Sequence, residues 1–328
     1  MDTNNSTPPL FPIPAMCSSP TYWRLAQGLI TVTTLLVLTS NILMMIVTVR
    51  AASTRINPYF FMSLAMSDLL MGLLVLPFDL AYAVQAETAN PSHEACTFSG
   101  LLFHILQTIS LFSFFALSLD RFLSIAYPLR YPTLLTQPVN VAGVVVIWSL
   151  PTVLYGVVPL TGLGQYGFKC WQSMCNLTVV DLDYLTFLML LSVVVFLATY
   201  GLNVRIFVIA KQQSQKIAAL GQRFQENSGQ DLRLRSSVKA VRSIVLALGL
   251  FTLCWGPYYS ALFSFVLFGA MVTPGTEFGL LWMAISNSFM NFFVFLATYK
   301  SFRMHFLRIM GRRNRVESLG TSDTLPDN

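Results

Sequence analysis

Several polar residues lie inside the most apolar stretches of this sequence, where polar side chains are costly and therefore suggest function, and four of them are considered first. Asp68 stands about 11 residues into an otherwise apolar run, 57–78, so a helix there would bury its carboxylate roughly 16 Å deep. Asn287 and Asn291 are spaced i,i+4 and share one face of a helix, and Ser110 supplies a hydroxyl from another run. Their oxygens suit a small hard cation. The alternative is a hydrogen-bonded network of these side chains and water without an ion.

No arrangement for catalysis is present. His93-Glu94 begins like a metalloprotease helix, but the second histidine is missing. The sequence has neither a glycine-rich phosphate loop nor a Cys-x-x-Cys motif. It therefore predicts a protein that is not an enzyme and that needs no cofactor beyond the cation considered at Asp68.

The composition requires membrane helices to position these residues. Of 328 residues, 55% are hydrophobic and only 10% are charged, whereas a soluble domain carries about a quarter charged residues. Seven apolar runs are long enough to cross a bilayer, and Asp68 is the one charged residue inside them. They are residues 25–49, 57–78, 98–119, 139–160, 184–204, 243–271 and 278–299. Because backbone groups in lipid must be satisfied internally, the sequence predicts an all-α bundle of seven transmembrane helices.

The basic residues indicate the orientation of the bundle. With the N-terminus outside, 18 of the 20 lysine and arginine residues fall in or beside inner segments, and only Arg24 and Lys169 fall outside. Inner loops next to membrane helices are enriched in these residues. The net charge of +6 therefore reflects orientation in the lipid bilayer, and nucleic acid is not an expected partner.

The runs divide the chain into three parts: an extracellular tail (1–22), a helical domain (23–300) and a cytoplasmic segment (301–328). From Lys300 to Met310, apolar residues recur at helical spacing among basic ones, which predicts a short amphipathic eighth helix on the inner leaflet. The alternative is a simple continuation of the seventh helix.

The predicted outer segments carry glycosylation sequons and cysteines. Three asparagines begin Asn-x-Ser/Thr sequons: Asn4, Asn5 and Asn176. Four cysteines fall in the oxidising compartment: Cys17, Cys96, Cys170 and Cys175. Four cysteines allow three connectivities, and the spacing alone does not choose among them.

Short motifs follow one another along the predicted helices. They are Ser40-Asn41 in the first, Ser63-Leu64-Ala65-Met66-Ser67-Asp68 in the second, Asp120-Arg121-Phe122 ending the third, Trp148 in the fourth and Cys254-Trp255-Gly256-Pro257 in the sixth. Their order and spacing, over about residues 25–310, resemble those of the class A (rhodopsin-like) G protein-coupled receptors, with an amine-receptor-like orphan subgroup as the nearest match.

This resemblance implies a plasma-membrane receptor that passes an extracellular or constitutive signal to a heterotrimeric G protein. In the family, the residue matching Arg121 contacts the G protein in the active state and its acidic neighbour, here Asp120, in the resting state. A sodium ion that favours the resting state would lie at Asp68 among Asn41, Ser110, Asn287, Ser288 and Asn291. The resemblance also implies that Cys96 pairs with the second outer loop, with Cys170 slightly preferred to Cys175 and the other cysteine left for Cys17.

Three departures from the family pattern bear on activation. Ser237 stands where the family often has an acidic partner for the arginine, which predicts elevated basal signalling. The seventh helix reads Asn291-Phe292-Phe293-Val294-Phe295 instead of Asn-Pro-x-x-Tyr, so the proline kink and the tyrosine hydroxyl are both missing. Tyr200, in the fifth helix, would therefore lack its usual tyrosine partner during coupling.

The ligand of such a receptor would bind between the helices in the outer half of the bundle. Phe103 stands where amine receptors carry an aspartate, so a conventional amine mode is not expected. The seventh run holds no lysine for retinal. The remaining residues with potential contacts are Asp79, His104, Gln107, Trp255, Tyr258 and Tyr259. Asp79 is an alternative counter-ion for a cation, although each of these residues has a simple packing role as its alternative.

Two other functional classes are open to this sequence. A seven-helix transporter or channel would need a polar path, for which Asp68 alone is little support. A receptor-like partner protein that does not signal would fit the altered seventh helix. If the protein does signal, arrestin and receptor kinases are expected partners through hydroxyl residues of the tail: Ser318, Thr321, Ser322 and Thr324.

Overall fold

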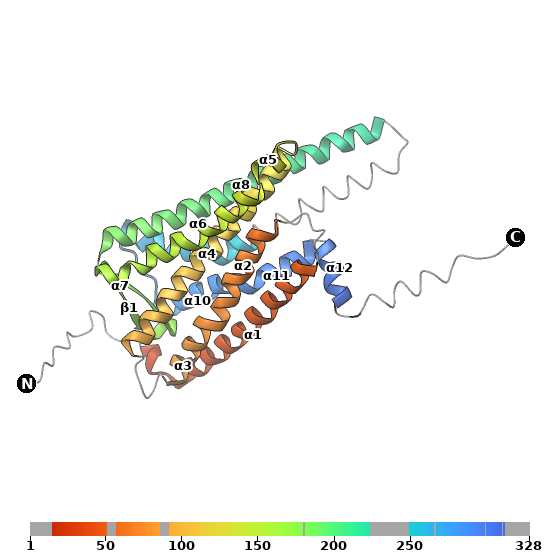
Figure 1. The fold of residues 1–328 in the computed structure, drawn as a ribbon. Helices are drawn as coiled ribbons and strands as arrows, with labels where there is room; N and C mark the ends of the chain where they lie inside the picture. The colour runs from red at the N-terminus through yellow and green to blue at the C-terminus, as the bar shows by residue number, and fades with distance from the viewer. Residues whose placement is uncertain are drawn as a thin grey trace, which may run out of the picture.

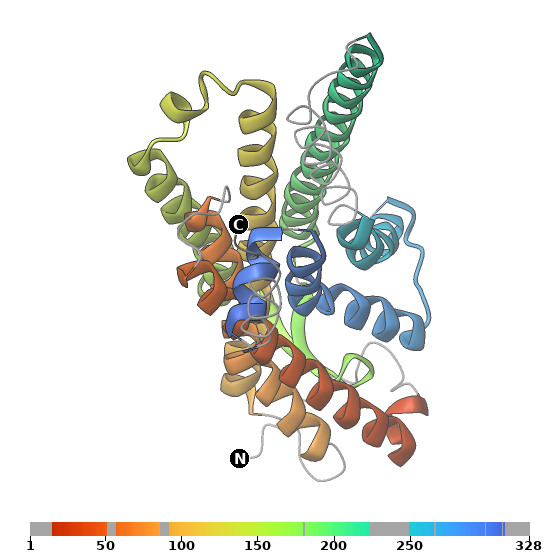
Figure 2. The ribbon, with the colours of Figure 1, turned by 90° about the vertical axis from the view of Figure 1, so that its right-hand side faces the viewer.

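The structure is a computed structural model that describes residues 15–50, 57–85, 92–179, 181–223, 249–265, 267–298, 300–309 and 311. It is an elongated bundle of helices, with a short β-hairpin covering one end (Figure 1). The long helices are α1 (Pro20–Arg50), α4 (His93–Ala126), α6 (Gln137–Gly156) and α8 (Leu182–Arg223). Both ribbon views show α8 projecting beyond its neighbours at the end opposite the hairpin (Figure 1, Figure 2).

The apolar runs of the sequence correspond to helices in the structure. Five helical segments within the described ranges are long and apolar enough to cross a membrane, and the pair α10 (Pro274–Ile285) and α11 (Asn287–Thr298) would make a sixth. The predicted run 243–271 contains a helix over 249–265, and its first residues lie outside the described ranges. The prediction of a transmembrane helix bundle is therefore confirmed.

The last predicted span is broken, whereas the sequence predicted one uninterrupted helix over 278–299. The axes of α10 and α11 differ by 41°, and Ser286 lies at the break. Its hydroxyl donates to the Trp282 carbonyl oxygen at 2.8 Å, a contact that competes with the helical hydrogen bonds and bends helices. The bend thus lies five residues before Asn291, although the proline expected to kink this helix is missing.

The second span contains an irregular turn. It consists of α2 (Pro58–Leu70), a π-helical segment η2 (Met71–Val75) and α3 (Leu76–Gln85). Pro77 follows this turn, and a proline cannot donate the usual helical hydrogen bond. Gly72 lies within the turn, where a Cβ atom would come within 3.0 Å of the side chains of Val37 and Leu38 on α1.

The hairpin lies between α7 (Val158–Thr161) and α8 in the chain and packs against α4 and α10 at its end of the bundle. Strands β1 (Gly164–Lys169) and β2 (Met174–Val179) are antiparallel, and Phe168 lies opposite Cys175. A 3₁₀ turn, η3 (Cys170–Gln172), connects them. It is followed by Ser173, the one described non-glycine residue with positive φ, at 58°. A second 3₁₀ turn, η1 (Ala15–Ser18), precedes α1, and the short helices α5 (Tyr131–Leu134) and α7 flank α6.

The helix α12 (Lys300–Ile309) forms where the sequence predicted a short amphipathic helix. Figure 1 shows it running in a different direction from α11. Phe302 is buried among aromatic rings, at 6.0 Å from Phe292, 6.3 Å from Phe61 and 6.4 Å from Phe295. Arg303 on the same helix is exposed. Contact of this helix with a membrane leaflet stays a prediction.

Candidate functional site

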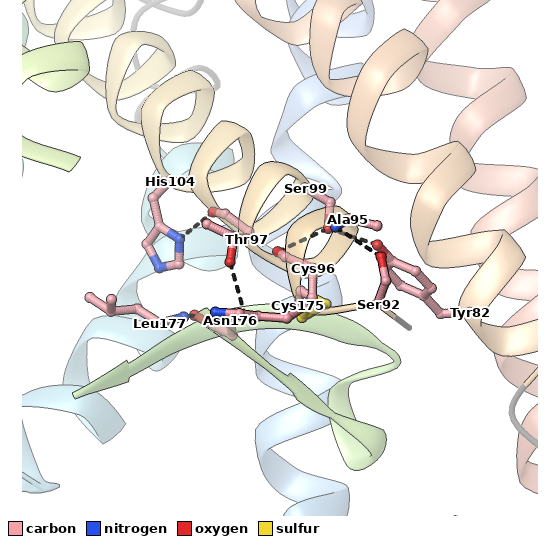
Figure 3. The surroundings of a disulfide bond; sticks show 12 residues. Tyr82, Ser92, Ala95, Cys96, Thr97, Ser99, His104, Cys175, Asn176 and Leu177 are labelled. Carbon is pink, nitrogen blue, oxygen red and sulfur yellow. Dashed lines mark hydrogen bonds between the residues drawn. A yellow bond between two sulfur atoms is a disulfide. The ribbon is translucent and has the colours of Figure 1, made fainter. Parts of the chain in front are cut away.

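Two disulfide bonds hold the hairpin to the rest of the chain. They join Cys96 to Cys175 and Cys17 to Cys170, so the slight preference for a bond between Cys96 and Cys170 was wrong. Figure 3 shows β2 crossing the end of α4 beside Cys96. Gly100 permits this approach, because a Cβ atom there would lie 3.1 Å from the Cys175 carbonyl oxygen. The residue facing α4 is therefore Cys175, and Cys170, in the turn, is left to reach Cys17.

Side chains add further contacts around η3. The Tyr22 hydroxyl on α1 lies 3.0 Å from the Cys170 carbonyl oxygen and 2.9 Å from Ser173 Oγ. On α10, the Glu277 carboxylate accepts hydrogen bonds from Trp171 Nε1, at 2.7 Å, and from Gln172 Nε2. Burial lowers the pKa of the Lys169 side chain, and the charge of Glu277 opposes this shift. The turn is thus bonded to α1 and α10 as well as to Cys17 through the disulfide bond of Cys170.

The predicted ligand-pocket residues lie in neighbouring groups of aromatic side chains. Trp255, Tyr258 and Tyr259 form one aromatic group, with Trp255 at 6.1 Å and 5.4 Å from the two tyrosine rings. His104 belongs to another, because its Nδ1 lies 2.8 Å from the Gly100 carbonyl oxygen and its ring lies 5.2 Å from Tyr155. Figure 3 shows His104 pointing toward the hairpin at Leu177. Tyr258 also packs against the cluster that contains Phe103 and Trp282, and it belongs with Tyr155 to a second cluster, so these groups adjoin one another. A shared ligand pocket stays a prediction.

Phe103, Gln107 and Asp79 are the remaining predicted contacts. Phe103 is buried in an apolar cluster with Met174 and Trp282. Asp79 is also buried, and neither its Oδ2 nor Gln107 Oε1 has a hydrogen-bond partner within the described ranges. Buried polar atoms are seldom left in this condition without water, an ion or a ligand.

The predicted ion-binding residues do come together. Asn291 Nδ2 donates to Asp68 Oδ2 at 3.2 Å, and the Ser110 and Ser288 hydroxyls face the same carboxylate. Asn41 Nδ2 donates to the Ser288 carbonyl oxygen at 2.9 Å. Asn287 is buried one turn before Asn291. This arrangement combines one carboxylate with several neutral oxygen atoms from four helices.

Asp120 and Arg121 form an ion pair near the end of α4, with Arg121 Nε 3.5 Å from Asp120 Oδ2. Asp120 is fully buried, and its Oδ1 accepts hydrogen bonds from the Tyr131 hydroxyl at 2.8 Å and from Asn57 Nδ2 at 3.2 Å. Asn57 also donates to Asn140 Oδ1 at 2.9 Å. Burial and the neighbouring carboxylate raise the pKa of Tyr131 to about 12. Sequence reasoning missed Asn57 and Asn140, which lie at the start of two apolar runs, and Tyr131, which lies between runs, because polar residues are ordinary at both kinds of position.

Tyr200 does not join this group. It lies on α8 with 45% of its side chain exposed. Phe295, which stands where the family has a tyrosine, packs edge-on against Phe61 at 4.4 Å between ring centroids. Tyr200 and Phe295 therefore lie in different environments, and only the first of them is a tyrosine.

Further hydrogen bonds connect the helices through polar residues whose partners the sequence did not predict. Trp148 Nε1 donates to Ser63 Oγ at 3.0 Å, and that hydroxyl lies 2.8 Å from Ser113 Oγ. Asn203 Nδ2 on α8 donates to Ser118 Oγ on α4 at 3.0 Å. Polar residues inside apolar runs were a usable signal for these contacts, although their partners depend on helix rotation.

Asn176 is a poor glycosylation site in this structure, contrary to the sequence prediction. The residue is buried, and the Nδ2 atom that would carry a glycan donates to Gln172 Oε1 at 2.8 Å. Its Oδ1 accepts from the Leu177 amide at 2.7 Å. A sequon gives no information about burial, which here follows from the hairpin. Asn4 and Asn5 lie outside the described ranges.

We expect glycosylation to depend on Asn4 and Asn5 alone. Peptide N-glycosidase F should change the gel mobility of the wild type and of the Thr178→Ala variant equally, because Thr178→Ala removes only the buried sequon. The Asn4→Gln/Asn5→Gln variant should run at one mobility with or without the enzyme. A remaining shift in that double variant, lost after adding Thr178→Ala, would contradict the burial argument.

Comparisons with known proteins agree with this arrangement. The sequence matches the model of the family "7 transmembrane receptor (rhodopsin family)" over residues 40–295. It is 31% identical to trace amine-associated receptor 13c of Danio rerio over 264 residues, which cover 74% of this chain and 72% of that receptor. It is 32% identical to the histamine H2 receptor of Rattus norvegicus over 254 residues, covering 74% of this chain and 67% of that receptor. The adenosine receptor A2b of Gallus gallus is 27% identical, with coverage of 77% and 78%. Since the family model matches well over half of the sequence, the chain belongs to the rhodopsin family of seven-transmembrane receptors.

Proposed function

We propose that this G protein-coupled receptor lies in the plasma membrane with its N-terminus and hairpin outside, and that it signals without added ligand. Family membership makes it a receptor and not an enzyme. The basic residues, concentrated on the side opposite the N-terminal tail, support the orientation. The alternative functions of a transporter or a channel have no comparable support.

The ion pair of Asp120 and Arg121 is the observation that carries the coupling proposal. Arg121 lies at the end of α4 away from the hairpin, where a G protein would dock on the cytoplasmic side, and its resting partner is a buried carboxylate 3.5 Å away. Asn57 and Tyr131 position that carboxylate. At position 237 an acidic residue would supply a second resting partner for the arginine, but this sequence has a serine there. With one carboxylate in place of two, the resting state is less favoured and basal activity rises.

The polar cluster around Asp68 supports a sodium ion as a second element of the proposal. Asp68, Ser110 and Ser288 offer a charged oxygen and two hydroxyls in one place, and Asn41 Oδ1 is buried without a hydrogen-bond partner in the described part of the chain. Hard cations prefer such oxygen ligands. An ion there would tie together α2, α4 and α11. Asn287 lies one turn from the same group and would complete it through water.

The relatives suggest a small polar ligand. Their names refer to trace amines, histamine and adenosine, and the aromatic group of Trp255, Tyr258 and Tyr259 offers flat apolar contacts for such molecules. Receptor kinases and arrestin would act on the serine and threonine residues of the C-terminal tail, which lie outside the described ranges.

We expect the unstimulated receptor to raise cAMP above the vector-only level and to cause G protein dissociation, and we expect Arg121→Ala to abolish both signals. Arg50→Ala is the matched control, because it removes an exposed arginine from the end of α1. Surface expression should be equal in all samples. Equal signals from the wild type and Arg121→Ala would favour a receptor-like protein that does not signal.

A further inference from the structure

Asp79 differs from the other two buried carboxylates of the described ranges. Asp68 accepts a hydrogen bond from Asn291, and Asp120 accepts two, from Asn57 and Tyr131. Asp79 is 1% exposed, and its Oδ2 has no hydrogen-bond partner there. A carboxylate removed from water is retained at such a position when something compensates its charge.

The surroundings of Asp79 follow from the helix that carries it. Leu76 and Ala83 are three residues before and four residues after Asp79, so all three share one face of α3. Leu76 and Ala83 belong to a buried cluster that also contains Phe103 of α4, Met174 of the hairpin and Trp282 of α10. Asp79 therefore lies on the face of α3 that borders the region occupied by this cluster.

Two contacts fix this face of α3. The Tyr82 hydroxyl lies 3.2 Å from Ser99 Oγ on α4, and Gln27 Nε2 on α1 donates to the Ala83 carbonyl oxygen at 2.9 Å. In the same cluster, Trp282 Nε1 is buried and also lacks a hydrogen-bond partner within the described ranges. The region thus combines a buried carboxylate whose Oδ2 has no hydrogen-bond partner in the described ranges with an aromatic indole ring.

The chemistry of this region selects the kind of cation. A hard metal ion needs several oxygen ligands, whereas Phe103, Met174 and Trp282 offer none from their side chains. A small organic ammonium ion needs one counter-ion and gains from aromatic faces. We propose that Asp79 is the counter-ion of a small amine ligand, which lies against Phe103 and Trp282. This inference rests on the proposed receptor function and names its ligand class.

The proposal places the charge on α3 instead of α4, where Phe103 occupies the usual position for an aspartate in amine receptors. The buried hairpin residue Met174 covers the region, so the ligand must be small and must displace this side chain. Methionine is suited to such movement, because it is unbranched and flexible.

The test compares charged and uncharged probes on purified receptor in detergent and in cells. The charged probes are 2-phenylethylamine and histamine, and the uncharged probe is 2-phenylethanol, which matches the first in shape. We expect at least one amine to raise the melting temperature of the wild type and to change cAMP in cells, and we expect the alcohol to do neither. Asp79→Asn should weaken the amine response at least about tenfold, the loss of one ionic contact worth about 1.4 kcal/mol.

Controls separate this site from general damage. Asp183→Asn changes an exposed acid in the first turn of α8 and should leave the amine response unchanged. Asp79→Asn without ligand should melt no lower than the wild type, because it removes a buried uncompensated charge. If Asp79→Asn does not accumulate, Asp79→Ala serves the same purpose.

Two outcomes would overturn the proposal: neither amine stabilises the wild type, or Asp79→Asn and Asp79→Ala respond as the wild type does. If amines stabilise the purified wild type through Asp79 but cells show no cAMP response or G protein dissociation, the ligand site stands and the proposed signalling function fails.

Discussion

Replacing either Cys96 or Cys175 with serine is expected to reduce the amount of receptor at the cell surface to about a tenth of the wild-type amount. The bond between these cysteines holds β2 against α4 at Gly100. Removing a native disulfide typically costs about 2–5 kcal/mol of folding free energy, which is a large share of the stability of most domains. Surface expression measured with an N-terminal epitope tag would test this.

Serine at Cys17 or Cys170 should have a smaller effect. The bond between them holds η3 near α1, and the Tyr22 hydroxyl still bonds the Cys170 carbonyl oxygen when that bond is lost. Trp171 likewise keeps its hydrogen bond to Glu277. A double variant lacking both Cys96 and Cys175 should be no worse than either single variant, because one bond is removed in each case. If Cys170→Ser reduced surface expression as much as Cys96→Ser, and Cys175→Ser had little effect, Cys96 would be paired with Cys170 instead of Cys175.

The positions of the membrane helices could be predicted, but their ends could not. Hydropathy marks the part of a helix that lies in lipid, whereas backbone hydrogen bonds continue into water. The run 98–119 is therefore only the middle of α4, which begins at His93, where Ser92 caps its N-terminus, and ends at Ala126. For the same reason α8 continues from the run 184–204 to Arg223. The break at Ser286 has no signal in an apolar pattern, because hydroxyls that bond the carbonyl oxygen four residues earlier also occur in unbroken helices, as at Thr34 and Ser118.

The candidate sites were likewise predictable only in part. Asp68 and Asn291 were identified because polar side chains are costly in lipid, and the structure brings them to 3.2 Å. The partners of Asp120 could not be found in this way, because Asn57 is the first residue of an apolar run and Tyr131 lies between runs, where polar residues are ordinary. The choice between Cys170 and Cys175 depends on which residue of the hairpin faces α4, and strand register cannot be read from cysteine spacing. Burial of Asn176 follows from the same register.

Asp120→Asn is expected to raise basal signalling about fivefold at equal surface expression. The carboxylate of Asp120 is fully buried, and asparagine keeps its size but removes the charge that pairs with Arg121 at 3.5 Å. A loss of about 1 kcal/mol from the resting state changes the ratio of active to resting receptor about fivefold. The pKa of Tyr131, raised to about 12, keeps its hydroxyl protonated near neutral pH, so this tyrosine can still donate to the amide oxygen of the variant.

Two further variants determine whether this effect passes through Arg121. Tyr131→Phe removes the hydrogen bond to Asp120 Oδ1 at 2.8 Å but leaves the ion pair, so it should raise basal cAMP much less than Asp120→Asn. Asp120→Asn combined with Arg121→Ala should return basal cAMP to the level of Arg121→Ala alone, because the released arginine is then missing. An Asp120→Asn receptor whose basal cAMP equals or falls below that of the wild type would mean that the ion pair does not restrain the resting state. Asp120 would then serve chiefly to hold the helix ends together through Asn57 and Tyr131.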